Sequence, residues 1–165
     1  MHDPRIPAAK AAALLKARSE RIAVAESSAG GLISSSLLAV PGASTYYVGG
    51  GVIYTARALN ALLGVSREDL QGMRSSSEPY AALLAETIRA KHRVEWGVSE
   101  TGAAGPTGNA YGDPAGHTCI AVSGPASKTR TLRTPTTDRW TNMGWFAEAA
   151  LELLVEALES APPKS

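Results

Sequence analysis

The sequence has 165 residues, of which 44% are hydrophobic, 19% charged and 5% aromatic, and its formal net charge is +1. A chain of this length and balance is expected to form one globular domain whose core needs no disulfide or metal to hold it together. Its Lys and Arg residues are scattered rather than clustered, so we expect no nucleic-acid partner.

The cysteine count and the hydropathy pattern bear on compartment. The single cysteine, Cys119, excludes an intramolecular disulfide, and no segment has the pattern of a signal peptide. No uninterrupted apolar run reaches the roughly 18 residues that a membrane span needs. We therefore expect a cytoplasmic protein with no membrane partner.

Hydrophobic spacing predicts helices and strands in alternation along the chain. The predicted helices cover 8–18, 31–39, 56–63, 77–92 and a last segment that Asp138 can cap. The predicted strands cover 21–25, 46–54 with a bend at three glycines, 96–99, 117–123 and 128–134. This order predicts an α/β fold, a single-domain αβα sandwich with a mixed sheet flanked by helices on both faces. Residues 1–165 form one domain in this interpretation, with its core at about 8–159 and a tail at 160–165.

The first predicted strand leads directly into small residues and a new helical pattern. Ser27, Ser28, Gly30 and Gly31 occupy this junction. The start of a helix directs unpaired N–H groups and the positive end of the helix dipole at one spot, so the junction is a candidate site for a phosphate or carboxylate. Such junctions are also routine connectors in α/β proteins, and both interpretations stay open.

A second polar junction follows the strand at 96–99. Residues just beyond the carboxyl ends of neighbouring strands converge on one crevice, so we expect Ser27 and Thr101 to lie close together. Gly102 and Gly105 add bare N–H groups beside Thr101, and a long loop follows at 107–115. An ordered loop of that length in a compact domain is often functional.

The sequence lacks the patterns of several common sites. It contains no phosphate-binding Gly-x-x-x-x-Gly-Lys-Ser/Thr loop, no dinucleotide-binding glycine pattern and no Gly-x-Ser-x-Gly elbow. His2, His92 and His117 are far apart and have no companion at metal-ligand spacing. We therefore expect no metal and no cofactor.

Six short motifs occur in the order and spacing of one family. They are AESSAGG at 25–31, VPGAS at 40–44, GVIY at 51–54, LGV at 63–65, SEP at 77–79 and TGAAGP at 101–106. On these motifs, nearly the whole chain resembles the CinA C-terminal domain family, whose active members are nicotinamide mononucleotide deamidases. The resemblance implies a stand-alone domain, commonly a homo-oligomer, that hydrolyses the carboxamide of nicotinamide mononucleotide to nicotinate mononucleotide and ammonia without a metal.

The same resemblance implies roles for individual residues. It assigns catalytic roles to Ser44 as nucleophile, to Tyr54 and to Thr101. It assigns binding of the small-molecule nucleotide to Ser27, Ser28, Gly30, Gly31, Gly102, Gly105 and Arg139. Hydrolysis of an amide needs a nucleophile, a base and donors for the developing oxyanion, and the substrate phosphate would fit the helix start after Ser27.

One departure from the family pattern bears directly on activity. Leu59 stands where the family has a lysine that is thought to help activate the nucleophile. Leucine cannot take a proton from a serine hydroxyl, and the guanidinium of nearby Arg57 cannot act as a base. His117, at a position where the family has threonine, is either a replacement base or a structural residue. Two functions stay open: an amidohydrolase, and a nucleotide-binding or sensing homologue that does not hydrolyse this substrate.

Overall fold

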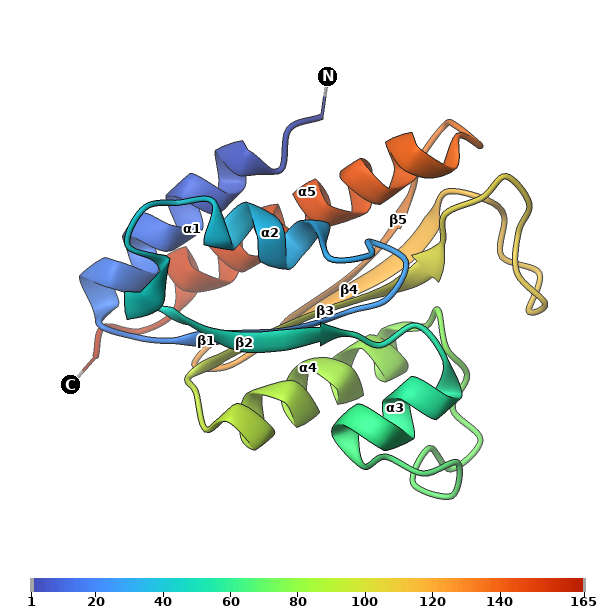
Figure 1. The fold of residues 1–165 in the computed structure, drawn as a ribbon, viewed down its shortest axis with the longest axis horizontal. Helices are drawn as coiled ribbons and strands as arrows, with labels where there is room; N and C mark the ends of the chain where they lie inside the picture. Colours follow the sequence, from blue (N-terminus) through green and yellow to red (C-terminus); the bar gives the residue numbers. More distant parts are fainter. Residues whose placement is uncertain (1, 165) are drawn as a thin grey trace.

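A five-stranded sheet forms the middle layer of the protein in this computed structural model, which describes residues 2–164 (Figure 1). Its strands are β1 (Ile22–Glu26), β2 (Tyr47–Val52), β3 (Trp96–Ala103), β4 (His117–Ser123) and β5 (Lys128–Arg133). Their order across the sheet is β2-β1-β3-β4-β5. β1 pairs in parallel with β2 and β3, whereas β4 pairs antiparallel with β3 and β5. The predicted mixed sheet is confirmed.

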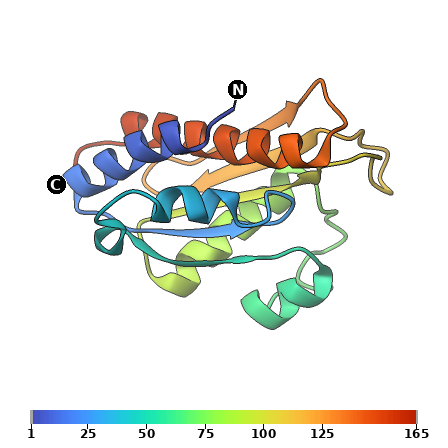
Figure 2. The ribbon, with the colours of Figure 1, turned by 45° about the horizontal axis from the view of Figure 1, so that its top comes forward.

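Helices cover both faces of this sheet. On one face lie α1 (Arg5–Arg18), α2 (Leu32–Leu38) and α5 (Arg139–Ser160), and on the other lie α3 (Ala56–Leu63) and α4 (Glu78–His92) (Figures 1 and 2). A short 3-10 helix, η1 (Ala43–Thr45), precedes β2. The αβα sandwich predicted from the order of elements is therefore confirmed.

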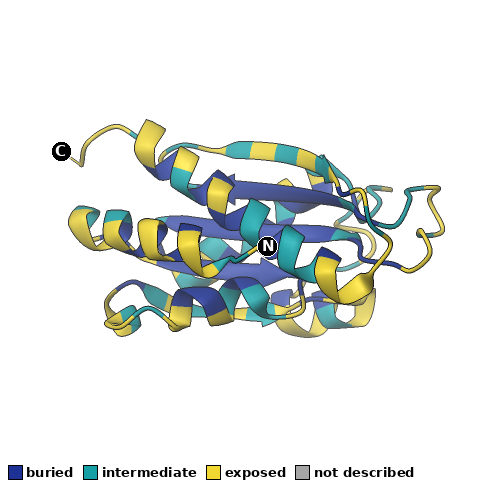
Figure 3. Cartoon of the chain, turned by 90° about the horizontal axis from the view of Figure 1, so that it is seen from above, coloured by how far each residue is buried: buried dark blue, intermediate teal, exposed yellow. Residues whose placement is uncertain are grey.

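The central strand β1 and the edge strands β2 and β5 differ in burial, and this explains why their compositions differ. β1 is buried at every position, which fits its continuous run of apolar residues. The edge strands β2 and β5 alternate between half-buried and exposed residues, and Figure 3 shows the contrast with the dark central strands. The larger core cluster joins the sheet to α1, α2 and α5, and a smaller cluster lies beneath α3 and α4.

Local signals set several element boundaries. The Ser77 hydroxyl accepts a hydrogen bond from the Tyr80 N–H at 3.4 Å at the start of α4. The Asp138 carboxylate accepts one from the Thr141 N–H at 2.8 Å at the start of α5. Gly64 ends α3 with a φ of 68°, a left-handed conformation that glycine adopts readily. These caps agree with the boundaries predicted from the sequence.

The end of β3 differs from the prediction. We expected this strand to end at Ser99, with Thr101 and Gly102 in the loop beyond it. In the structure β3 continues to Ala103, because its antiparallel pairing with β4 extends as far as the pair Ala103 and His117. Thr101 and Gly102 are therefore held in the sheet.

The last helix, α5, ends at Ser160. Ser165 lies outside the described residues. No helix in the described part of the chain has the length and hydropathy of a membrane span.

Candidate functional site

A cavity of about 500 Å³ lies where β1 and β2 end, on the face of the sheet that α3 and α4 cover. Its volume is in the range of small-molecule sites. The lining residues come from the ends of β1 to β3, from α3 and α4, and from two loops. They are Ser27, Tyr54, Thr55, Ala56, Leu59, Arg67, Leu70, Met73, Ser75, Ser76, Tyr80, Thr101, Gly102, Asn109 and Tyr111.

Four of the residues predicted from the sequence meet in this cavity: Ser27, Tyr54, Thr101 and Gly102. The Thr101 side chain is buried, and its Oγ1 accepts a hydrogen bond from the Ser76 N–H at 3.0 Å. Thr101 thereby ties the segment before α4 to β3. The convergence of strand ends that the sequence predicts brings these side chains together.

Leu59 also lines the cavity. It is 1% exposed and packs in the apolar cluster that contains Ile53, Leu63 and Tyr80. The position at which the family has a lysine is thus part of the cavity wall, and here that wall is apolar.

Ser44 does not lie with Tyr54 and Thr101 in a single chain. It is an exposed residue of η1, before the start of β2, whereas Tyr54 follows the end of β2. The six residues of β2, at about 3.3 Å each, separate the two positions by roughly 20 Å along the sheet. The structure therefore separates the expected nucleophile from the other two expected catalytic residues.

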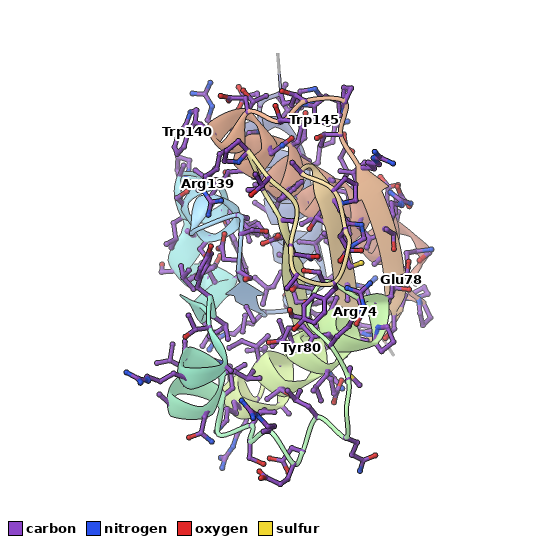
Figure 4. All side chains as sticks on the ribbon, turned by 90° about the vertical axis from the view of Figure 1, so that its right-hand side faces the viewer. Arg74, Glu78, Tyr80, Arg139, Trp140 and Trp145 are labelled. Atoms are coloured by element: carbon purple, nitrogen blue, oxygen red, sulfur yellow. The ribbon has the colours of Figure 1, made fainter. Side chains whose placement is uncertain are left out.

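Arg139 contacts the site from outside the cavity. Its Nη1 donates to the Gly105 carbonyl at 2.6 Å, and its Nη2 donates to Tyr54 Oη at 3.0 Å. In Figure 4, Arg139 and Tyr80 lie on opposite sides of the sheet end. Arg139 thus joins the Tyr54 side chain to the Gly105 loop, and neither Arg139 nor Gly105 lines the cavity.

His117 has a structural contact at the same end of the sheet. Its Nε2 lies 2.9 Å from the Ser76 carbonyl oxygen, to which it donates, and 3.6 Å from Asp113 Oδ1. His117 does not line the cavity, and as the partner of Ala103 it lies at the end of the sheet opposite Ser44. Within one chain it supports the Ser76 backbone and is not placed to deprotonate Ser44.

The helix start after Ser27 is occupied by the protein itself, which corrects the expectation of a free phosphate site there. The buried Glu26 carboxylate accepts hydrogen bonds from the N–H groups of Gly31 at 2.8 Å, Ile33 at 3.0 Å and Ser34 at 2.9 Å. These are the donors that a bound anion would otherwise use. Gly31 and Gly30 therefore shape this junction and do not line the cavity.

A second buried carboxylate, that of Glu100, accepts hydrogen bonds from other donors of this junction. Glu100 Oε2 accepts from the N–H groups of Ser27 at 3.1 Å and Ala29 at 2.7 Å, while its Oε1 accepts from the hydroxyls of Ser28 and Thr118. Burial raises the pKa of Glu100, and the hydrogen bonds from Ser28 and Ala29 oppose that rise. The Ser28 hydroxyl, expected to contact substrate, instead contacts Glu100.

Sequence reasoning missed several lining residues. Arg67 is the only charged residue in the lining of this cavity, and Ser75, Ser76, Tyr80, Asn109 and Tyr111 supply most of its other polar groups. The length of the loop that carries Asn109 and Tyr111 is the one sequence signal that points to these two residues. Arg74 holds it in place through a 2.7 Å ion pair with Asp113, and this pairing lowers the pKa of that carboxyl.

The lining defines the chemistry available to one chain. It offers hydroxyls from Ser27, Thr101, Tyr54 and Tyr80 and a guanidinium from Arg67, but it contains no His, Asp, Glu, Lys or Cys side chain. Such a lining suits a polar ligand with an anionic group, and it lacks a group that accepts a proton from a serine. Among residues 2–164 no three His, Cys, Asp or Glu residues gather at metal-binding distance.

The comparisons with known proteins agree with this architecture. The family model described as the CinA C-terminal domain matches residues 6–158. A CinA-like protein of Anaeromyxobacter sp. is 41% identical over 146 residues, which cover 88% of this chain and 36% of that protein. A CinA-like protein of Myxococcus xanthus is 38% identical over 142 residues, 86% of this chain and 34% of that protein. The chain thus spans about a third of the length of these curated relatives.

Solved structures show the same fold. A CinA superfamily protein of Klebsiella pneumoniae superposes with a TM-score of 0.88 at 26% identity, over 95% of this chain and 98% of that chain. A competence/damage-inducible protein of Agrobacterium tumefaciens superposes with a TM-score of 0.86 at 27% identity, over 95% and 96% of the two chains. From the family match, the identity to these relatives and the shared fold, we conclude that this chain belongs to the CinA C-terminal domain family.

Proposed function

We propose that the cavity binds a pyridine mononucleotide, of which nicotinamide mononucleotide is the first candidate, and that the protein does not hydrolyse its amide. The observation that carries the proposal is the composition of the cavity wall. Ser27, Tyr54 and Thr101 are present, as the family resemblance implies, but the position of the family lysine is the buried Leu59. The cavity has hydroxyls that can contact such a ligand, and its lining contains no base.

The phosphate of such a ligand has one cationic partner in the cavity, Arg67. The N–H groups of Gly31, Ile33 and Ser34 are already bonded to Glu26, so the α2 start offers the phosphate no free donors. A charge-assisted hydrogen bond from a guanidinium to a phosphate contributes about 1.5–3 kcal/mol. We therefore expect Arg67 to discriminate the nucleotide from its nucleoside.

Calorimetric titration tests this proposal. Nicotinamide mononucleotide should bind saturably, and Arg67→Ala should weaken that binding by about tenfold or more, the change that about 1.4 kcal/mol corresponds to. Nicotinamide riboside, which has no phosphate, should bind Arg67→Ala and the unchanged protein equally well. Arg57→Ala is the matched control, because Arg57 is an exposed arginine of α3 that does not line the cavity. Equal nucleotide affinity for Arg67→Ala and Arg57→Ala would refute the role of Arg67.

A second candidate is the deamidase activity implied by the family resemblance. The observation that favours it is the shared cavity of Ser27, Tyr54 and Thr101. The two candidates differ in one readout. The deamidase releases ammonia from nicotinamide mononucleotide, whereas a binding protein saturates with the same compound and releases none.

A further inference from the structure

Tyr80 is a buried tyrosine of the cavity wall whose hydroxyl has no partner within residues 2–164. It lies in the first turn of α4 (Figure 4), is 6% exposed and packs in the apolar cluster that contains Leu59. The hydroxyl of Tyr46, the other buried tyrosine, donates to the Leu37 carbonyl, whereas the Tyr80 backbone N–H is the only group of Tyr80 bonded to a side chain. A tyrosine hydroxyl removed from bulk water usually has a hydrogen-bond partner. The partner of the Tyr80 hydroxyl is therefore expected among molecules that enter the cavity.

The oxygen of this hydroxyl opens onto the cavity. Every side-chain oxygen or nitrogen that is fully enclosed in the described part of the chain has a hydrogen-bond partner, so an oxygen without one must touch open space. The open space that Tyr80 borders is the cavity. Burial raises the pKa of the Tyr80 hydroxyl, so the group stays protonated at neutral pH. Tyr80 thus presents an O–H donor to a ligand.

Thr101 presents a second O–H donor near the first. Its Oγ1 accepts a hydrogen bond from the Ser76 N–H at 3.0 Å, which leaves the hydroxyl proton of Thr101 for another acceptor. Ser76 lies directly before the cap of α4, and Tyr80 lies in the first turn of that helix. The two hydroxyls therefore belong to the same part of the cavity wall.

The cavity has a buried end and an exposed mouth. At the buried end, Thr101 is 2%, Tyr80 6% and Leu59 1% exposed. The mouth includes Tyr111, which is 54% exposed, and the exposed Arg67. A phosphate bound by Arg67 leaves the pyridine ring and its substituent directed at the buried end, and this step rests on the proposed function.

The buried end contains two O–H donors and no charged side chain, since Arg67 is the only charged residue in the lining of this cavity. A neutral carbonyl oxygen accepts hydrogen bonds from both hydroxyls without bringing a charge out of water. A carboxylate accepts them too, but it loses its hydration with no cation beside it, and an unpaired buried charge is strongly unfavourable. The buried end therefore favours an amide over the corresponding acid.

We infer that Tyr80 determines specificity: its hydroxyl donates to the carbonyl of the carboxamide on the ligand's ring, and the cavity thereby selects the amide mononucleotide over the acid. The acid is the compound that deamidation of this ligand would produce. A protein that binds the amide, does not hydrolyse it and rejects the acid responds to the amide in the presence of both compounds.

The state of the Tyr80 hydroxyl is tested without any ligand. Tyr80→Phe removes the hydroxyl and keeps the ring, so the urea midpoint of the ligand-free variant should not fall. Tyr46→Phe is the matched control, because it loses the hydrogen bond to the Leu37 carbonyl, and its midpoint should fall. A midpoint for Tyr80→Phe that falls as far as that of Tyr46→Phe overturns the inference, since the Tyr80 hydroxyl would then have a partner in the protein.

Calorimetric titration measures the selection. The unchanged protein should bind nicotinamide mononucleotide at least about tenfold more tightly than nicotinate mononucleotide. Tyr80→Phe should weaken binding of the amide about fivefold, the loss of one neutral hydrogen bond, whereas Tyr46→Phe should bind it with unchanged affinity. Equal affinity of the unchanged protein for amide and acid overturns the inference.

A mononucleotide whose pyridine ring carries no carboxamide separates a direct contact from an altered cavity shape. Because it has no carbonyl for the Tyr80 hydroxyl, Tyr80→Phe and the unchanged protein should bind it equally well. If Tyr80→Phe weakens this compound as much as it weakens nicotinamide mononucleotide, Tyr80 does not contact the carboxamide and the inference is overturned.

Free nicotinamide, which has the carboxamide and no phosphate, distinguishes failure of this inference from failure of the proposed function. Ligand-observed NMR at millimolar concentration detects its weak binding. If the nucleotide does not bind but nicotinamide does, and Tyr80→Phe weakens nicotinamide, the proposed function fails and the role of Tyr80 stands. If neither compound binds, both are overturned.

Discussion

Replacing Glu26 with alanine tests whether the helix start after Ser27 is filled by the protein's own carboxylate. Glu26 is fully buried, and besides three backbone N–H groups it accepts the Ser34 hydroxyl at 2.7 Å. Loss of a helix cap costs about 0.5–2 kcal/mol, and each buried donor left without an acceptor costs about 1–3 kcal/mol. Because Glu26→Ala leaves the N–H groups of Gly31, Ile33 and Ser34 without their acceptor, we expect a loss of about 3–5 kcal/mol in the free energy of unfolding.

Urea unfolding followed by circular dichroism measures this loss. The midpoint should fall without a change in the slope m, since the exposed surface of the unfolded chain is the same. Glu68→Ala is the matched control, because Glu68 is exposed in a surface turn, and it should stay within about 0.5 kcal/mol of the unchanged protein. A loss below about 1 kcal/mol for Glu26→Ala would refute the reasoning, because three N–H groups would then not depend on this carboxylate.

Two further substitutions test the buried carboxylate and the missing base. Burial raises the pKa of Glu100 in the folded protein, so its contribution to stability is full below about pH 4.3 and is lost as pH rises through the folded pKa. Glu100→Gln has no ionisable group at this position and lacks this loss, so its free energy of unfolding relative to the unchanged protein should increase with pH in urea titrations. A difference that does not vary with pH would contradict the raised pKa of Glu100. Leu59→Lys places an amine in the cavity wall and should give ammonia release from nicotinamide mononucleotide that exceeds a protein-free control, which the unchanged protein should not do. Leu59→Met is its control. Equal rates of ammonia release for the two variants would show that the missing lysine at position 59 is not what prevents hydrolysis.

The fold was largely predictable because its signals are local. The apolar run of β1 and the caps at Ser77 and Asp138 each predict an element that the structure contains. The end of β3 was not predictable from such signals. Glu100 and Thr101 are polar and resemble the start of a loop, but tertiary hydrogen bonds satisfy both side chains inside the sheet.

The residues of the candidate site that are placed by strand direction were predictable from the sequence. Ser27, Tyr54 and Thr101 follow or end strands that terminate at one end of the sheet, so their convergence follows from strand direction. Ser44 precedes a parallel strand and therefore lies at the other end, which motif order along the chain does not reveal. The occupation of the α2 start by Glu26 was missed because a helix start looks the same in sequence whether its donors are free or bonded.

The central claim is that this chain binds a pyridine mononucleotide without hydrolysing it. Calorimetric titration with nicotinamide mononucleotide, followed by an ammonia assay of the same sample, tests it most directly. The account predicts saturable binding with one site per chain and no ammonia above a protein-free control. Ammonia release that depends on the protein, or the absence of binding, would contradict it.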